Sequence, residues 1–203
     1  LRLIGDWHRR FEQHGDLILP GRSADDIVAA KASGRTAIIF GFQNCSPIEE
    51  DLGLVQVFHE LGVRFMQLTY NNQSVLGGGC YEAADSGLTR FGREVIAEMN
   101  RVGMVIDLSH SGERTTLEAI AASTRPVVIS HADPLFLHEN VRNKSGRVLR
   151  ALAESGGMQG FSLYPLHIGP DCTLERFCAA VARTAELMGV ERLGFGTDTV
   201  RNW

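Results

Sequence analysis

Histidine and aspartate side chains stand directly after short apolar runs at three places in this sequence. His110 ends the motif DLSH, His131 ends VVISH, and Asp198 ends GFGTD. If these runs are parallel strands, their carboxyl ends meet at one edge of the sheet, and the three side chains lie close together. Imidazole and carboxylate groups are common zinc ligands, and a carboxylate can also transfer protons. The spacing therefore predicts a metal site at this edge.

Other polar residues follow the remaining runs: Gln43, Tyr70, Asn71 and Tyr164. A single histidine at a strand end is usually a structural residue, but two on consecutive strands beside an acid favour a function. The other five histidines are divided between predicted helices, where we expect surface or packing roles (His8, His14, His59), and loops near the site (His138, His167). Asp107 is expected to be hydrogen-bonded within the sheet rather than to orient His110.

Six apolar runs predict strands. They are Thr36–Phe42, Val63–Thr69, Met104–Leu108, Pro126–Ser130, Met158–Leu163 and Arg192–Thr197. Helical spacing predicts helices at 1–14, 23–33, 90–102, 112–123, 146–155 and 174–188, with Thr89 and Thr173 as caps of the third and the last. Ser46, Pro47 and Glu49 are typical of a capping box, which predicts one more helix that begins there and ends at Gly62.

Strands and helices therefore alternate, which predicts an α/β fold with a parallel sheet and right-handed crossovers. Two folds have this order, an open doubly wound sheet and a TIM (β/α)8 barrel. The segment Gly77-Gly78-Gly79 lacks the G-x-G-x-x-G spacing and does not stand in a tight strand-to-helix turn. It therefore argues against a dinucleotide-binding sheet. No linker or repeat divides the chain, so we expect residues 1–203 to belong to a single domain.

The composition is that of an ordinary globular domain, with 44% hydrophobic and 22% charged residues. The net charge of -4 comes without a basic stripe, which argues against a nucleic-acid partner. No apolar run is long enough for a transmembrane helix. The four cysteines form no C-x-x-C pair and are expected to be reduced. Residues 1–10 lack the apolar stretch of a signal peptide, so we expect a cytoplasmic location.

The run that begins LTYNNQSVLGGGC and extends to Ile120 resembles the central block of bacterial members of the renal (membrane) dipeptidase family. PVVISHADP, VRNKS and GFGTD continue this resemblance in the same order, so that it extends from Gly41 to Asp198. The ordered combination is far more specific than any single motif. The family belongs to the amidohydrolase superfamily. The resemblance thus implies a TIM barrel with a two-zinc site that cleaves dipeptides and tolerates a C-terminal D-residue.

The resemblance also implies roles for individual residues. His110 and His131 match the two histidine zinc ligands of the family, and Asp198 matches the acidic residue that handles protons. Arg142 matches the arginine that binds the substrate carboxylate, although without the resemblance it would be interpreted as a surface arginine in a long loop. Tyr70 stands at a substrate-facing position. We therefore expect zinc as the cofactor and a small dipeptide-like substrate as the partner, and a homodimer is compatible with the family.

The sequence departs from the family pattern at two places. The H-x-D pair of the family's first strand has no counterpart, because Asp6-Trp7-His8 has the wrong order and lies in a predicted helix. A barrel needs eight strands and six are predicted, so we expect the first two βα units to lie outside this chain. The bridging glutamate of the family falls at Gln43, whose neutral amide is a weaker ligand. The site is therefore expected to hold one or two zinc ions.

These observations together predict a metallo-dipeptidase that hydrolyses dipeptides by a metal-activated water. Two alternatives remain open at this point: an amidohydrolase that acts on another small amide or lactone, and a catalytically silent barrel that binds a peptide-like ligand or a partner protein. The geometric expectation is that the nearest imidazole nitrogens of His110 and His131 lie roughly 3–4 Å apart, with Asp198 at the same edge.

Overall fold

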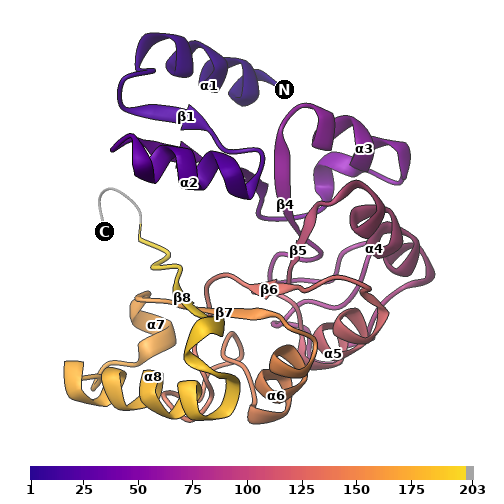
Figure 1. The fold of residues 1–203 in the computed structure, drawn as a ribbon. Helices are drawn as coiled ribbons and strands as arrows, with labels where there is room; N and C mark the ends of the chain where they lie inside the picture. Colours follow the sequence, from indigo (N-terminus) through magenta and orange to yellow (C-terminus); the bar gives the residue numbers. More distant parts are fainter. Residues whose placement is uncertain (200–203) are drawn as a thin grey trace.

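The main sheet consists of six parallel strands, each paired with the next along the chain, in a computed structural model that describes residues 1–199. The strands are β3 (Phe40–Phe42), β4 (Val63–Gln67), β5 (Val105–Asp107), β6 (Val128–Ile129), β7 (Met158–Phe161) and β8 (Leu193–Phe195). Figure 1 shows these strands along the inner side of a curve and the helices on its outer side. The predicted strand order and the parallel α/β class are therefore confirmed.

The helices that follow these strands are α3 (Gly53–Glu60), α4 (Arg90–Val102), α5 (Glu113–Ala122), α6 (Gly146–Glu154), the short α7 (Pro165–Ile168) and α8 (Leu174–Met188). Thr89 caps α4 by accepting a hydrogen bond from the Gly92 backbone N–H, as predicted. Thr173 caps α8 in the same way. A 3₁₀ turn, η2 (Val190–Arg192), leads into β8, and α7 was not predicted because it is only one turn long.

The predicted strand Thr36–Phe42 is wrong as a single element. It forms β2 (Thr36–Ile38) and then β3, and these two strands belong to different sheets. β2 pairs in parallel with β1 (Ile18–Pro20), which was not predicted. β1 has only three residues and ends in proline, so it carries too little apolar pattern for recognition from sequence.

The predicted capping box at Ser46 is also wrong. Ser46 begins a 3₁₀ turn, η1 (Ser46–Ile48), and the backbone N–H of Ser46 donates to Asn44 Oδ1 at 2.9 Å. Glu49 adopts φ 51°, in the left-handed region, and this conformation stops the turn from continuing as an α-helix. The helix α3 therefore begins later, at Gly53.

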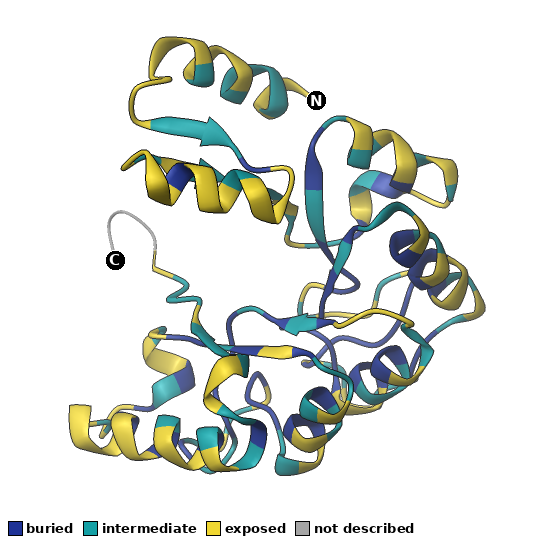
Figure 2. Ribbon diagram, viewed as in Figure 1, coloured by how far each residue is buried: buried dark blue, intermediate teal, exposed yellow. Residues whose placement is uncertain are grey.

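Residues 1–38, which we call the amino-terminal layer, contain α1 (Arg2–Gln13), β1, α2 (Ala24–Ala32) and β2. Figure 2 shows that this layer is mostly exposed, and α1 has no buried residue. The aromatic rings of Trp7 and Phe11 lie 6.3 Å and 6.0 Å from that of Phe40 on β3, and these contacts attach the layer to the main sheet.

The hydrophobic core lies between the main sheet and its outer helices. Fully buried side chains come from the strands, from the residues directly after them and from the helix faces that cover them, and they include Met66, Leu68, Ile96, Met99, Leu108 and Leu149. A second cluster lies under α8 and is built around Phe161, Phe177 and Leu137. Burial on this scale is the main contribution to stability, and it fixes the strand ends that carry the polar residues.

Within the described residues, none of the helices combines the length and the apolar character that crossing a membrane requires. The four cysteines are free thiols, as predicted.

Candidate metal and substrate site

His110 and His131 converge at the carboxyl edge of the main sheet. His110 follows β5 and His131 follows β6, and their Nε2 atoms lie 3.0 Å apart. The two side chains are buried, with exposed fractions of 4% and 9%. The separation is at the lower limit of the expected 3–4 Å. The predicted convergence of the two imidazoles is therefore confirmed. Their role as zinc ligands stays a prediction.

The hydrogen bonds of His110 define its tautomer. Its Nδ1 lies 2.7 Å from Asn71 Oδ1, and its Nε2 lies 3.2 Å from Arg142 Nη2. Because a guanidinium can only donate, His110 Nε2 is an acceptor and the ring proton is on Nδ1. Asn71 therefore orients His110 and adopts φ 63° to do so, a conformation that asparagine tolerates better than most residues.

Burial also determines the charge of the two imidazoles. Loss of solvent, reinforced by the charge of Arg142, lowers the pKa of His110 to about 2. Burial lowers the pKa of His131 as well, although the carboxylates of Asp107 and Asp198 oppose this effect. Both rings are therefore neutral at physiological pH, which is the form of histidine that binds a metal ion.

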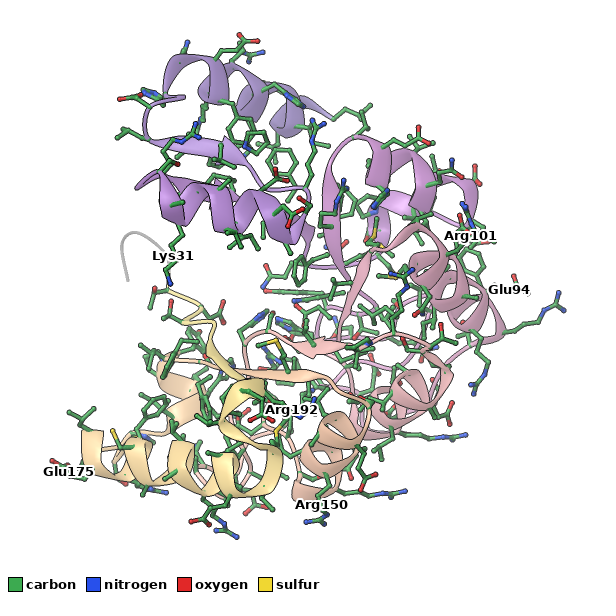
Figure 3. All side chains as sticks on the ribbon, viewed as in Figure 1. Lys31, Glu94, Arg101, Arg150, Glu175 and Arg192 are labelled. Atoms are coloured by element: carbon green, nitrogen blue, oxygen red, sulfur yellow. The ribbon has the colours of Figure 1, made fainter. Side chains whose placement is uncertain are left out.

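Two buried basic side chains contact His110 or the backbone on either side of it. Arg142 and Lys144 are 2% and 3% exposed. Arg142 donates through Nη1 to the Ser109 carbonyl and through Nη2 to the His131 carbonyl, and Lys144 Nζ donates to the Leu108 and Ser111 carbonyls. The alternative of a surface arginine is therefore wrong. By contrast, Figure 3 shows labelled charged residues such as Glu94, Arg150 and Glu175 on the outer helices.

Neither buried cation has a carboxylate within ion-pair distance among residues 1–199. Burial lowers the pKa of Arg142, and it lowers that of Lys144 to about 7. Unpaired buried cations are costly unless a group of opposite charge joins them. The arrangement therefore suits an anionic ligand group next to His110.

The other predicted site residues lie along the same edge of the sheet. Asp198 follows β8 with φ 56°, and its charge acts on both His131 and Arg142. The Tyr70 ring is 47% exposed and stacks on the His110 ring, with centroids 4.4 Å apart. Gln43 follows β3 as an exposed residue. The structure thus places Tyr70 against His110, puts Asp198 close enough for its charge to act on His131, and leaves Gln43 at the open end of the sheet.

The glycine-rich segment packs against the loop that carries His110. Gly79 forms a β-bridge with Ser111, and the Cys80 backbone N–H donates to the His110 carbonyl at 3.0 Å. A Cβ atom on Gly79 would lie 2.0 Å from the Asn71 carbonyl oxygen, so only glycine fits there. The segment therefore serves close packing around His110, in agreement with the argument against a dinucleotide fold.

Several residues near the site were not assigned a role from sequence. His167, on α7, is buried beside Ser162, and burial followed by the charge of Arg142 lowers its pKa to about 3. Tyr164 precedes α7 and its ring lies 5.0 Å from that of His167. Burial raises the pKa of Asp133 to about 7. The only sequence signal for Lys144 was its place in the VRNKS motif beside Arg142.

The imidazole pair fits a zinc ion as part of its ligand set. Two neutral rings that present Nε2 toward each other supply the nitrogen donors that zinc prefers. Among residues 1–199, no group of three or more histidine, cysteine, aspartate and glutamate residues is arranged to hold a metal ion. His110 and His131 would thus supply two of the four ligands of a typical site.

The chain is similar to known dipeptidases over nearly its whole length. The family model for membrane dipeptidase, peptidase family M19, matches residues 1–200. Dipeptidase tcpJ of Claviceps purpurea is 31% identical over 195 residues, which cover 94% of this chain and 46% of that protein. The chain thus spans about half the length of this curated relative.

Two solved structures share the fold. An amidohydrolase from Pseudomonas aeruginosa matches with a TM-score of 0.92 and 41% identity over 98% of this chain and 62% of that one. A metallopeptidase from Rhodobacter sphaeroides, liganded with a phosphinate mimic of the dipeptide L-Ala-D-Ala, matches with a TM-score of 0.86 and 25% identity over 95% of this chain and 57% of that one. The six strands are therefore part of a TIM-type barrel, and the chain belongs to the membrane dipeptidase family, peptidase family M19.

Proposed function

We propose that the protein is a zinc-dependent dipeptidase and that residues 1–203 form part of its single barrel domain. Its proposed substrates are dipeptides, including those with a D-residue at the C-terminal position. The Rhodobacter sphaeroides structure, which holds a mimic of L-Ala-D-Ala, supports this substrate class by similarity. The cytoplasmic location and the homodimer stay predictions.

One observation carries the proposal: a pair of neutral imidazoles lies beside the buried Arg142, a cation that has no carboxylate within ion-pair distance among residues 1–199. Arg142 Nη2 is only 3.2 Å from His110 Nε2, so a group bound to Arg142 would lie next to a metal bound to the imidazoles. In a dipeptide, the residue that carries the free carboxylate also supplies the amide nitrogen of the peptide bond, so the carboxylate lies only one Cα away from the scissile bond. The arrangement therefore matches the two groups that a dipeptidase must hold at once.

In this proposal, Arg142 binds and orients the substrate. Its guanidinium is held by backbone carbonyls of Ser109 and His131. When a metal ion takes His110 Nε2, the Nη2 hydrogen now directed at that nitrogen is released, and Arg142 can pair with the C-terminal carboxylate through parallel hydrogen bonds. This contact places the peptide bond over the imidazole pair. Tyr70 forms one wall, and an open groove of about 1170 Å³ extends from its ring past Asn72 and Gln73. The groove offers room for the substrate's remaining side chain.

When bound, zinc lowers the pKa of a water molecule and polarises the scissile carbonyl. Asp198 accepts a proton from the attacking water and returns it to the amine that leaves when the C–N bond breaks. Its charge acts on His131 and Arg142, which supports its position near the reacting groups. One dipeptide and one water thus yield two amino acids.

The test is zinc content and dipeptide turnover of the intact protein, with substrates that carry either a C-terminal carboxylate or a C-terminal amide. The wild type should cleave the carboxylate form with the higher kcat/KM, and Arg142→Gln should remove most of this preference by raising KM. A protein that binds no zinc and cleaves no dipeptide after zinc is added contradicts the proposal.

The number of ions depends on Gln43. Gln43→Glu should raise the affinity for a second divalent ion, because it restores an anionic bridge between two cations. The affinity for the ion at His110 and His131 should change less. Metal stoichiometry, measured with dipeptide hydrolysis for both variants, decides this point. Two ions per chain in the unmodified protein would show that no carboxylate bridge is needed.

A further inference from the structure

The carboxylate of Asp107 is buried behind the imidazole pair. It is 5% exposed and accepts five hydrogen bonds from three residues. Ser109 and Ser130 each donate through the backbone N–H and through the hydroxyl, and Gln67 donates through Nε2 at 3.0 Å. Donors that converge on both oxygens are typical of a carboxylate that acts only as an acceptor.

Ser130 connects this carboxylate to His131. A serine hydroxyl has one hydrogen, and that of Ser130 is directed to Asp107 Oδ2. Ser130 Oγ therefore accepts a hydrogen bond from His131 Nδ1, which lies 2.7 Å away. The ring proton of His131 is thus on Nδ1, so the Nε2 lone pairs of His131 and His110 face each other across 3.0 Å with no proton between them, an arrangement that a cation bound to both nitrogens stabilises.

From this chain of hydrogen bonds we propose that Asp107 is a positioning residue, which acts through Ser130 to hold His131 in the tautomer whose Nε2 can bind a metal ion. His110 reaches the same tautomer through the neutral Asn71 amide. The two imidazoles therefore differ, because His131 is oriented by a buried charge and His110 by an amide. The link to metal binding rests on the proposed function, but the tautomer is a property of the chain itself.

Asp107 lies on the strand next to the one that leads into His131, which explains why it orients His131 and not His110. Asp107 on β5 pairs in register with Val128 on β6, two residues before Ser130. Its carboxylate therefore lies beside the strand that leads into His131. His110, by contrast, stands in the turn after β5, where the chain bends away from Asp107. Residues in contact with a metal-binding imidazole fix its orientation and tune its basicity, and their loss weakens metal binding by roughly 10–100-fold.

Asp107→Asn tests the proposal because it keeps the size of the side chain and reverses one hydrogen bond. The new amide nitrogen donates where Oδ2 accepted, so the Ser130 hydroxyl must donate to His131 Nδ1. The ring proton then moves to Nε2, and the lone pair needed by a metal is lost. The same reversal makes an aspartate-to-asparagine change severe in a serine-protease triad.

The measurement is the ¹⁵N NMR shift of the histidine ring nitrogens in the metal-free intact protein, together with zinc affinity by chelator competition. We expect His131 protonated on Nδ1 in the wild type and on Nε2 in Asp107→Asn, with zinc affinity lower by roughly 10–100-fold. Gln67→Met is the matched control: it removes another hydrogen bond to Asp107 and should leave the tautomer unchanged and zinc affinity within about twofold.

A wild-type His131 that carries its proton on Nε2 overturns the proposal, and so does an Asp107→Asn variant with an unchanged tautomer and unchanged zinc affinity. If Asp107→Asn does not fold, Ser130→Ala interrupts the chain of hydrogen bonds with Asp107 in place. It should mix the two His131 tautomers and weaken zinc binding by about tenfold. A wild type with the expected tautomer but no zinc affinity contradicts the proposed function and leaves the positioning role of Asp107 intact.

Discussion

The amino-terminal layer and the main sheet differ sharply in how they bury their residues. In residues 1–38, only Gly21 and Ala30 are buried. Leu1, directly before α1, and Leu3, in its first turn, are 83% and 75% exposed. In the main sheet, every strand except β3 and β8 has a buried residue, and the helices outside it supply fully buried leucine, isoleucine and methionine side chains. The layer is therefore held with little burial, whereas extensive long-range packing holds the sheet.

The difference in burial determines which of the two regions can hold a metal and substrate site. A metal or substrate site needs side chains held to within a fraction of an ångström, and only a packed core provides that rigidity. Every predicted site residue that the structure brings together lies on the loops of the main sheet. The layer contributes none of them, and segments with little burial open at lower free energy.

The largest expected effect is on zinc binding and turnover, and it should arise in the main sheet and not in the amino-terminal layer. His131→Ala should abolish dipeptide turnover and weaken zinc binding by more than roughly 100-fold, a loss greater than that of a group that only supports a ligand. His8→Ala, on the exposed α1, should leave both quantities unchanged. Zinc affinity and turnover measured on both variants check this, and equal losses would mean that the layer also shapes the site.

The second comparison concerns stability and uses one substitution in both regions. Leu149→Ala removes a fully buried side chain on α6 and should lower the free energy of unfolding by about 2–5 kcal/mol. Leu3→Ala removes an exposed side chain and should change it by less than about 0.5 kcal/mol. Urea denaturation of the metal-free protein measures both. A large effect of Leu3→Ala would show that another surface covers α1.

The pH dependence of stability should come from the main sheet, where burial holds His110 and His167 neutral. Their folded-state pKa values of about 2 and about 3 lie below the ordinary 6.5, so protonation favours the unfolded chain. Stability is therefore complete above pH 6.5 and is lost as pH falls toward these values. Each histidine should account for about 1–2 kcal/mol between pH 6.5 and pH 5.

Denaturation of the metal-free protein at several pH values measures this slope. His167→Phe should make the slope shallower, because it removes one titrating group. A slope that does not change in this variant contradicts the assignment of His167.

The smallest expected effects concern two helix caps. Thr89 caps α4 in the main sheet, and Ser23 caps α2 in the layer through a capping box with Asp26. Thr89→Ala should lower the free energy of global unfolding by about 1 kcal/mol. Ser23→Ala should accelerate hydrogen exchange in α2 and leave global unfolding nearly unchanged, because the layer opens first. Equal effects on global unfolding would show that the two regions unfold as one unit.

Much of the fold could be predicted from the sequence, because its signals are local. Apolar runs and capping residues predicted the order of the six strands of the main sheet and the caps Thr89 and Thr173. The break at Ile39 could not be predicted, since the apolar residues of the run Thr36–Phe42 are nearly continuous and the run is divided only because its two halves pair with different strands. The sequence likewise contains no signal that Glu49 adopts φ 51° and thereby ends the turn that begins at Ser46.

For the site, the sequence by itself determined which residues stand at the strand ends. Alternation of strand and helix makes the sheet parallel, so His110, His131 and Asp198 must share one edge. The tertiary structure alone decided the burial of Arg142 and Lys144 and the partnership of Asp107 with Ser130. Those contacts join residues more than twenty positions apart, across neighbouring strands and loops. No local pattern encodes such distances, because packing of the whole core sets them.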